Sequence, residues 1–105
     1  MKWPDFDSYA AKLNIMALFT VVLDFAGGTY ISQFRAVSVR AAAAKHASKL
    51  VGNKALCTLA IRRRLGDGLS AEKPIAIAGV RNVWCCSASV GKKFALVNFV
   101  ATAES

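Results

Sequence analysis

The stretch of sequence that decides the fold runs from residue 18 to residue 36 and reads L-F-T-V-V-L-D-F-A-G-G-T-Y-I-S-Q-F-R-A. Two runs rich in apolar, β-branched and aromatic side chains, residues 18–25 and 29–36, flank the pair Gly27-Gly28. The favoured two-residue hairpin turns need positive φ angles, which glycine adopts at little cost. The stretch therefore predicts a β-hairpin that turns at Gly27-Gly28.

The predicted turn sets which residues of the two strands lie opposite each other. Phe25 would lie opposite Tyr30 and Val21 opposite Phe34, and these pairs share a face that is almost wholly apolar. Because side chains alternate across a strand, the second face, which includes Ile31, is half polar. One face of the hairpin is therefore expected in the core and the other in water or at an interface.

An alanine-rich helix is expected directly after the hairpin. Ser38 is a typical N-cap, residues 39–51 suit a helix, and Gly52 stands at the stop position. At 100° per residue, His46 falls in the middle of the apolar stripe of this helix. We therefore interpret this histidine as a packed or interfacial residue rather than as a general base.

The middle of the chain is ambiguous. Residues 53–65 fit either a helix or a strand, and a second helix, ended by Gly66-Asp67-Gly68, is the favoured interpretation. Residues 69–79 are expected to form a connecting loop, with residues 75–78 as its extended part.

Residues 80–100, V-R-N-V-W-C-C-S-A-S-V-G-K-K-F-A-L-V-N-F-V, predict a second hairpin around Gly91-Lys92. This turn pairs Trp84 with Phe99 and again gives one clean apolar face. The expected fold is α+β: two hairpins form a four-stranded antiparallel sheet, with one or two helices on one face, in the order ββα(α)ββ.

We expect one domain, residues 15–105, preceded by an N-terminal arm, residues 1–14. Met16 opens the strand pattern and is an alternative to Met1 as the biological start. A chain of 105 residues has room for a single core.

Composition points to self-association. The chain is 55% hydrophobic and only 19% charged, so it has difficulty covering its apolar surface alone. The second face of the C-terminal hairpin is too apolar to be left in water. The expected partner is therefore a second copy, in a homodimer. The candidate interface residues are Ile31, Val83, Cys85, Phe94, Leu96 and Val100.

The net charge of +8 limits the class of partner. Nucleic acid, an acidic protein or an anionic surface would be attracted, although such charges also serve simply as a solvated face. Two tight clusters are candidate contacts for nucleic acid or another anion: Arg62, Arg63 and Arg64, and Lys92 and Lys93. A nucleic-acid-binding protein is accordingly the alternative to a protein-binding module.

Catalytic and metal-binding patterns are weak. The chain has one histidine, no C-x-x-C, and scattered carboxylates. Cys85 and Cys86 are adjacent, so on a strand their side chains point to opposite faces and do not bind one ion together. We expect no catalysis, no metal and no cofactor. The predicted function is a non-catalytic interaction module that binds itself and a protein partner.

A cytoplasmic location is expected. No apolar run approaches the roughly 18 residues of a membrane span. The run at residues 15–23 is flanked by aspartates and lacks a small-x-small cleavage site, unlike a secretory signal. Three cysteines, an odd number, are typical of a reducing compartment.

Residues 18–51 resemble the hairpin and helix that open HicB-type antitoxins. The likeness lies in F-T-V-V-L at residues 19–23, G-G-T-Y at residues 27–30 and the alanine-rich helix capped by Ser38. Phe34-Arg35-Ala36-Val37 stands where the family has a Pro-Gly-Cys turn. The resemblance implies an α+β domain whose partner is a small ribonuclease toxin.

Overall fold

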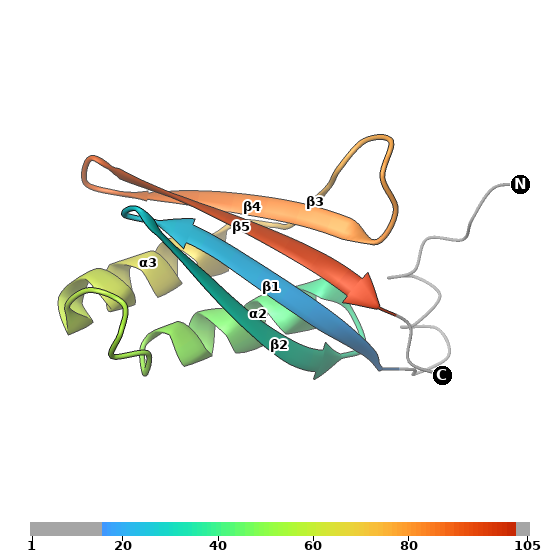
Figure 1. The fold of residues 1–105 in the computed structure, drawn as a ribbon, viewed down its shortest axis with the longest axis horizontal. Coiled ribbons are helices and arrows are strands. Elements are labelled where there is room, and N and C mark those ends of the chain that lie inside the picture. Colours follow the sequence, from blue (N-terminus) through green and yellow to red (C-terminus); the bar gives the residue numbers. More distant parts are fainter. Residues whose placement is uncertain (1–15, 103–105) are drawn as a thin grey trace, which may run out of the picture.

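The computed structural model describes residues 16–102. Within this range one antiparallel sheet is covered on one face by two helices (Figure 1). The α+β class and the antiparallel sheet expected from the sequence are confirmed. The N-terminal arm expected at residues 1–14 lies outside the described residues. In chain order the elements are β1 (Ala17–Phe25), β2 (Gly28–Ala36), α2 (Val39–Leu50), α3 (Leu59–Ala71), β3 (Ile75–Ala76), β4 (Val83–Val90) and β5 (Lys93–Thr102).

The sheet has five strands in the order β2-β1-β5-β4-β3, so the expected number of four is corrected. The additional strand, β3, pairs with β4 and sets Ile75 opposite Cys85. The two hairpins are joined by β1 and β5, which run antiparallel at the centre of the sheet. The first and last described strands are therefore direct neighbours.

The first hairpin forms, but it turns at Ala26-Gly27 instead of Gly27-Gly28. Ala26 and Gly27 have φ angles of 51° and 80°, as a tight two-residue turn requires. Phe25 consequently pairs with Gly28 rather than with Tyr30. Because the register differs by two residues, every side chain keeps its predicted face.

Two interactions explain this shifted turn. The Tyr30 ring lies over Gly28, where an added Cβ would come within 2.8 Å of the Tyr30 hydroxyl. Next to the turn, the Thr29 hydroxyl donates a hydrogen bond to Asp24 at 2.7 Å. Gly28 therefore makes room for a tyrosine ring, and its φ angle is not what requires glycine.

The second hairpin has the predicted register. Its turn is Gly91-Lys92, and Trp84 pairs with Phe99. Gly91 has a φ of 62°, which explains glycine at this position.

Helix α2 also agrees with its sequence signals. The Ser38 hydroxyl accepts a hydrogen bond from the Ala41 amide at 3.1 Å, as an N-cap does. The helix ends at Leu50, and the Gly52 amide donates to the carbonyl of Lys49.

Helix α3 starts later and continues further than predicted. It begins at Leu59, after the N-cap Thr58, and runs through Gly66 and Gly68 to Ala71. The expectation that these glycines end the helix is wrong because they serve close packing instead. A Cβ on Gly66 would lie 3.3 Å from the carbonyl oxygen of Ala47 in α2, and one on Gly68 would lie 3.1 Å from Cβ of Ala88 in β4.

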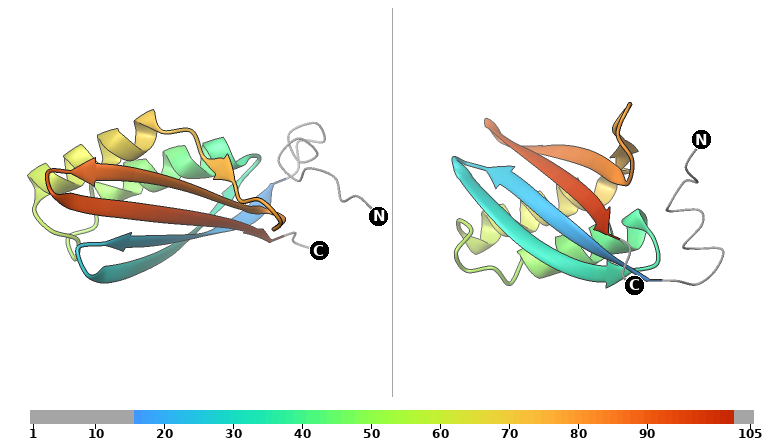
Figure 2. Two further views of the ribbon diagram at one scale, coloured as in Figure 1. Left: turned by 90° about the horizontal axis from the view of Figure 1, so that it is seen from above. Right: turned by 45° about the vertical axis from the view of Figure 1, so that its right-hand side comes forward.

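The core lies between the sheet and the two helices, which Figure 2 shows on the same side of the sheet. Alternate residues of β1, from Phe19 to Phe25, are fully enclosed, together with Phe99 of β5 and Leu65 of α3. The rings of Phe19 and Trp84 lie 6.0 Å apart, centroid to centroid. The opposite face of the sheet carries no element of the described chain.

Candidate functional site

The uncovered sheet face is the largest candidate surface, and we call it the open face. Strand pairing places five side chains in one row that crosses all five strands: Ile31, Val22, Asn98, Cys85 and Ile75. Ile31 and Ile75 stand at opposite edges of the sheet, 68% and 67% exposed. The row is therefore apolar at both edges and is interrupted at the centre by the polar side chain of Asn98.

All six candidate interface residues lie on the open face. Leu96 and Val100 of β5 flank the row on either side, and Val83 pairs with Val100. Phe94 is 59% exposed but lies by the β4–β5 turn, about 20 Å from Val100 at about 3.3 Å per residue. Five of the six candidate interface residues therefore lie in or next to the row, and Phe94 lies at one end of the open face.

Sequence reasoning missed Ile75. Residues 69–79 were expected to form a loop with an extended part at 75–78, and the sequence did not indicate that Ile75 belongs to the sheet. A two-residue strand carries almost no alternation of its own, so its face is decided by its pairing with β4.

The open face is poor in charge. Among the strand residues that alternate onto it, the charged ones are Asp24 and Arg35. Thr29 donates to Asp24, and Arg35 lies on the edge strand β2. The net charge of +8 is therefore carried almost entirely by other parts of the molecule.

Arg62, a candidate anion contact, has a different role in the structure. It is only 9% exposed, and its guanidinium donates to three backbone carbonyls: Val51 at 3.0 Å, Cys57 at 3.1 Å and Leu56 at 3.4 Å. These carbonyls belong to the turn between α2 and α3, in which Cys57 has a φ of 49°. Arg62 holds this turn together and is removed from the set of anion contacts.

The other four candidate cations, Arg63, Arg64, Lys92 and Lys93, are exposed. The first pair lies in the first half of α3 and the second pair at the β4–β5 turn. Figures 1 and 2 place the start of α3 and this turn at the same end of the molecule. The two pairs of cations therefore lie toward the same end of the molecule, one on α3 and the other at the β4–β5 turn.

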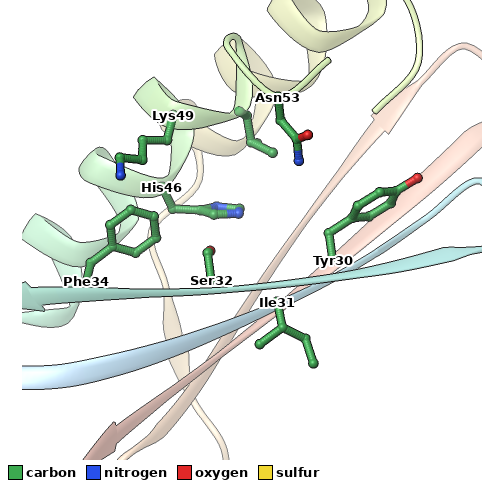
Figure 3. Close-up of a pocket in the computed structure, with 8 residues that line it drawn as sticks. Tyr30, Ile31, Ser32, Phe34, His46, Lys49 and Asn53 are labelled. Atoms are coloured by element: carbon green, nitrogen blue, oxygen red, sulfur yellow. The ribbon is translucent and has the colours of Figure 1, made fainter. Parts of the chain in front are cut away.

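A pocket of about 230 Å³ lies between β2 and α2 (Figure 3). Tyr30, Ser32 and Phe34 of β2 line one side, and His46 and Lys49 of α2 line the other. Ile31 also borders the pocket, but its side chain extends from the far side of the strand, toward the open face. Sequence reasoning did not find this pocket because its walls come from two separate elements.

His46 is packed, as its place in the apolar stripe predicts, yet its ring points into the pocket (Figure 3). It meets the rings of Phe34 and Phe99 edge to face, at centroid distances of 6.1 and 6.3 Å. Burial among these rings lowers its pKa from 6.5 to about 4. The imidazole is therefore neutral at physiological pH, with one nitrogen as a donor and the other as an acceptor.

Within residues 16–102, the side chains that could bind a metal or carry out thiol chemistry are not gathered in one place. Cys85 faces the open side while Cys86 lies in the core, and both thiols are free, as is that of Cys57. Burial raises the pKa of Cys86 to about 11, with smaller contributions from Cys85 and Glu72. No group of three or more His, Cys, Asp or Glu side chains gathers in this range.

Comparison of the chain with family models, with curated proteins and with solved structures finds no match. The resemblance of residues 18–51 to HicB-type antitoxins therefore stays a prediction. Within the described part of the chain, neither helix has the length and apolarity needed to cross a membrane.

Proposed function

We propose that the protein is a non-catalytic interaction module that forms a homodimer through its open face. The observation that carries this proposal is the row from Ile31 to Ile75, apolar except for Asn98, left uncovered on an almost uncharged face. An apolar surface of this extent is costly in water and is typical of an interface. Two such faces pack as stacked sheets about 10 Å apart.

Charge favours a second copy as the occupant. Two molecules of net charge +8 repel each other, and the repulsion is smallest where the cations are fewest. The open face meets this condition because, among the described strand residues that point onto it, Arg35 is the cation and Asp24 carries the opposite charge. Its side chains also approach in number the about 20 that each partner contributes to a standard interface.

The test is the oligomeric state of matched variants. In sedimentation velocity at tens of micromolar, the wild type is expected to sediment as a dimer. Ile31→Lys puts a charge at one edge of the row and is expected to give monomers, whereas Ala44→Lys, on the exposed side of α2, leaves the dimer intact. A wild type that stays monomeric at millimolar concentration would contradict the proposal.

Nucleic-acid binding is a second candidate, supported by the two exposed cation clusters at one end of the molecule. Neutralising phosphate contacts weakens binding and lowers its salt dependence by about one counterion per contact. We expect the quadruple change of Arg63, Arg64, Lys92 and Lys93 to Gln to abolish binding of a labelled oligonucleotide in fluorescence anisotropy at low salt. Lys54→Gln with Lys73→Gln is the control. Equal losses in both variants, or no wild-type binding, would exclude this function.

A small ribonuclease toxin is the protein partner that the HicB resemblance implies. The hairpin and helix on which the resemblance rests are the consecutive elements β1, β2 and α2. A toxin gene adjacent to this one, whose product co-purifies with the chain and loses its ribonuclease activity, would support this partner. An unrelated gene neighbourhood would remove its support.

A further inference from the structure

The pocket between β2 and α2 has the size of a small ligand. A closed apolar cavity of about 150 Å³ holds benzene, and drug-sized sites begin near 300 Å³. At about 230 Å³ the pocket accommodates one ring with a short substituent. Its walls include the rings of Tyr30 and Phe34 and the side chain of Leu50, which suit an apolar body.

His46 supplies an unused polar group in this pocket. The residue is only 5% exposed, and its ring makes no hydrogen bond with any described residue. In residues 16–102 no side-chain nitrogen or oxygen is fully enclosed without a partner, so the free imidazole nitrogens open onto the pocket. A buried donor without a protein partner is satisfied by water or by a ligand.

The charges around the pocket favour an anion. No aspartate or glutamate lines it, and Lys49 places its ammonium 5.7 Å from the centroid of the Phe34 ring. The positive field of the whole chain acts in the same direction. An anionic group in the pocket would meet the Lys49 ammonium and the uncharged imidazole, with no lining carboxylate opposing it.

We propose that this pocket binds a small apolar carboxylate of about the size of a benzoate ion. Its carboxylate would pair with the Lys49 ammonium and accept a hydrogen bond from His46, while its ring packs against Phe34 and Leu50. The site is independent of the open face because Ser32 and Phe34 alternate away from Ile31 on β2.

Binding is tested with three probes of one shape: benzoate, benzamide and benzylammonium. In NMR titrations we expect benzoate to bind with a dissociation constant of about 1 mM and to shift the signals of His46 and Ser32. Benzamide should bind several-fold more weakly and benzylammonium not at all. Absence of benzoate binding at 20-fold this concentration, or equal binding of benzamide, would overturn the proposal.

Variants separate this site from nonspecific attraction. Lys49→Gln should weaken benzoate about threefold, as expected for one partly exposed ion pair, and leave benzamide unchanged. Lys54→Gln, an exposed lysine outside the pocket, is the matched control and should change neither. Ser32→Leu should fill the pocket and abolish both. If Lys49→Gln and Lys54→Gln weaken benzoate binding equally, the assignment of the carboxylate to Lys49 is wrong. This comparison holds even if Ser32→Leu does not fold.

Discussion

At the scale of single residues, two buried polar side chains determine how the molecule responds to its conditions. His46 is enclosed by aromatic rings without a hydrogen-bond partner, and Arg62 is enclosed by three carbonyl acceptors. His46 is stable in its surroundings only when it is neutral, whereas Arg62 is stabilised by the hydrogen bonds that its guanidinium donates to these carbonyls. We therefore expect the stability of the protein to depend on pH through His46 and on the side-chain hydrogen bonds of Arg62.

His46 makes stability depend on pH in the acidic range. Its pKa in the folded state, about 4, is below the unfolded value of 6.5, so the unfolded chain takes up a proton first. The contribution of His46 to the free energy of unfolding is fully present above pH 6.5. It is lost as the pH is lowered to 4, a decrease of roughly 3 kcal/mol. Urea denaturation at pH 7 and pH 4.5 measures this loss. His46→Leu should largely remove the dependence, and an equal loss in that variant would assign it to other groups.

Arg62 is expected to be important for stability, and its neighbour is not. Arg62→Met leaves three carbonyls of the α2–α3 turn without their charged donor, which should cost about 3 kcal/mol. Arg63→Met changes an exposed side chain and should stay within about 0.5 kcal/mol. Thermal denaturation followed by circular dichroism compares the two. Similar melting temperatures for both variants would contradict the structural role of Arg62.

At the scale of elements, the sequence predicts what depends on local pattern and misses what depends on distant contacts. Both hairpins and the capped helix α2 follow from alternation, turn residues and Ser38. The first turn was misplaced because the Tyr30 ring, not backbone freedom, explains Gly28. The strand order could not be derived because no local pattern records that β1 pairs with β5, and the extended residues expected at 75–78 become a strand only through their pairing with β4.

The candidate sites divide in the same way. Alternation alone places Val83, Cys85 and Leu96 on one face, so the open face was predictable. The burial of Arg62 and the pocket at His46 were not, because each depends on how α2 packs against another element.

The glycines of α3 provide an element-scale prediction. Gly66→Ala would normally favour a helix by about 1 kcal/mol, but its methyl would meet the Ala47 carbonyl in the backbone of α2. Because helix backbone moves little, we expect a net loss of about 1 kcal/mol in the free energy of unfolding. Ser70→Ala, at an exposed position of α3, should instead be neutral or slightly stabilising. Guanidinium titrations distinguish the two outcomes, and a stabilised Gly66→Ala would refute tight α2–α3 packing.

At the scale of the whole molecule, one helix-covered face and one open face give the domain two different surfaces. Helices α2 and α3 cover the core on one face of the sheet, while no described element covers the open face. Cys85 lies in the middle of that face and reports whether it is covered.

The alkylation rate of Cys85 should depend on protein concentration. In a dimer its half-buried thiol is covered, so iodoacetamide should modify it more slowly at high concentration, while Cys57 at the α2–α3 turn keeps its rate. Peptide mass spectrometry after timed labelling measures both. Ile31→Lys should make the Cys85 rate independent of concentration. If the Cys85 rate is already constant in the wild type, the open face is free in solution.

The pairing of β1 with β5 also determines when the protein can fold during its synthesis. The strand made first among those described needs, on one side, the strand made last. At about 5–20 residues per second, β1 and β2 leave the ribosome on the order of 10 s before β5 arrives. Throughout that interval the edge of β1 that later pairs with β5 has no partner, and an unpaired apolar edge is prone to aggregation. The sheet order thus leaves β1 without its second neighbour until β5 has been made.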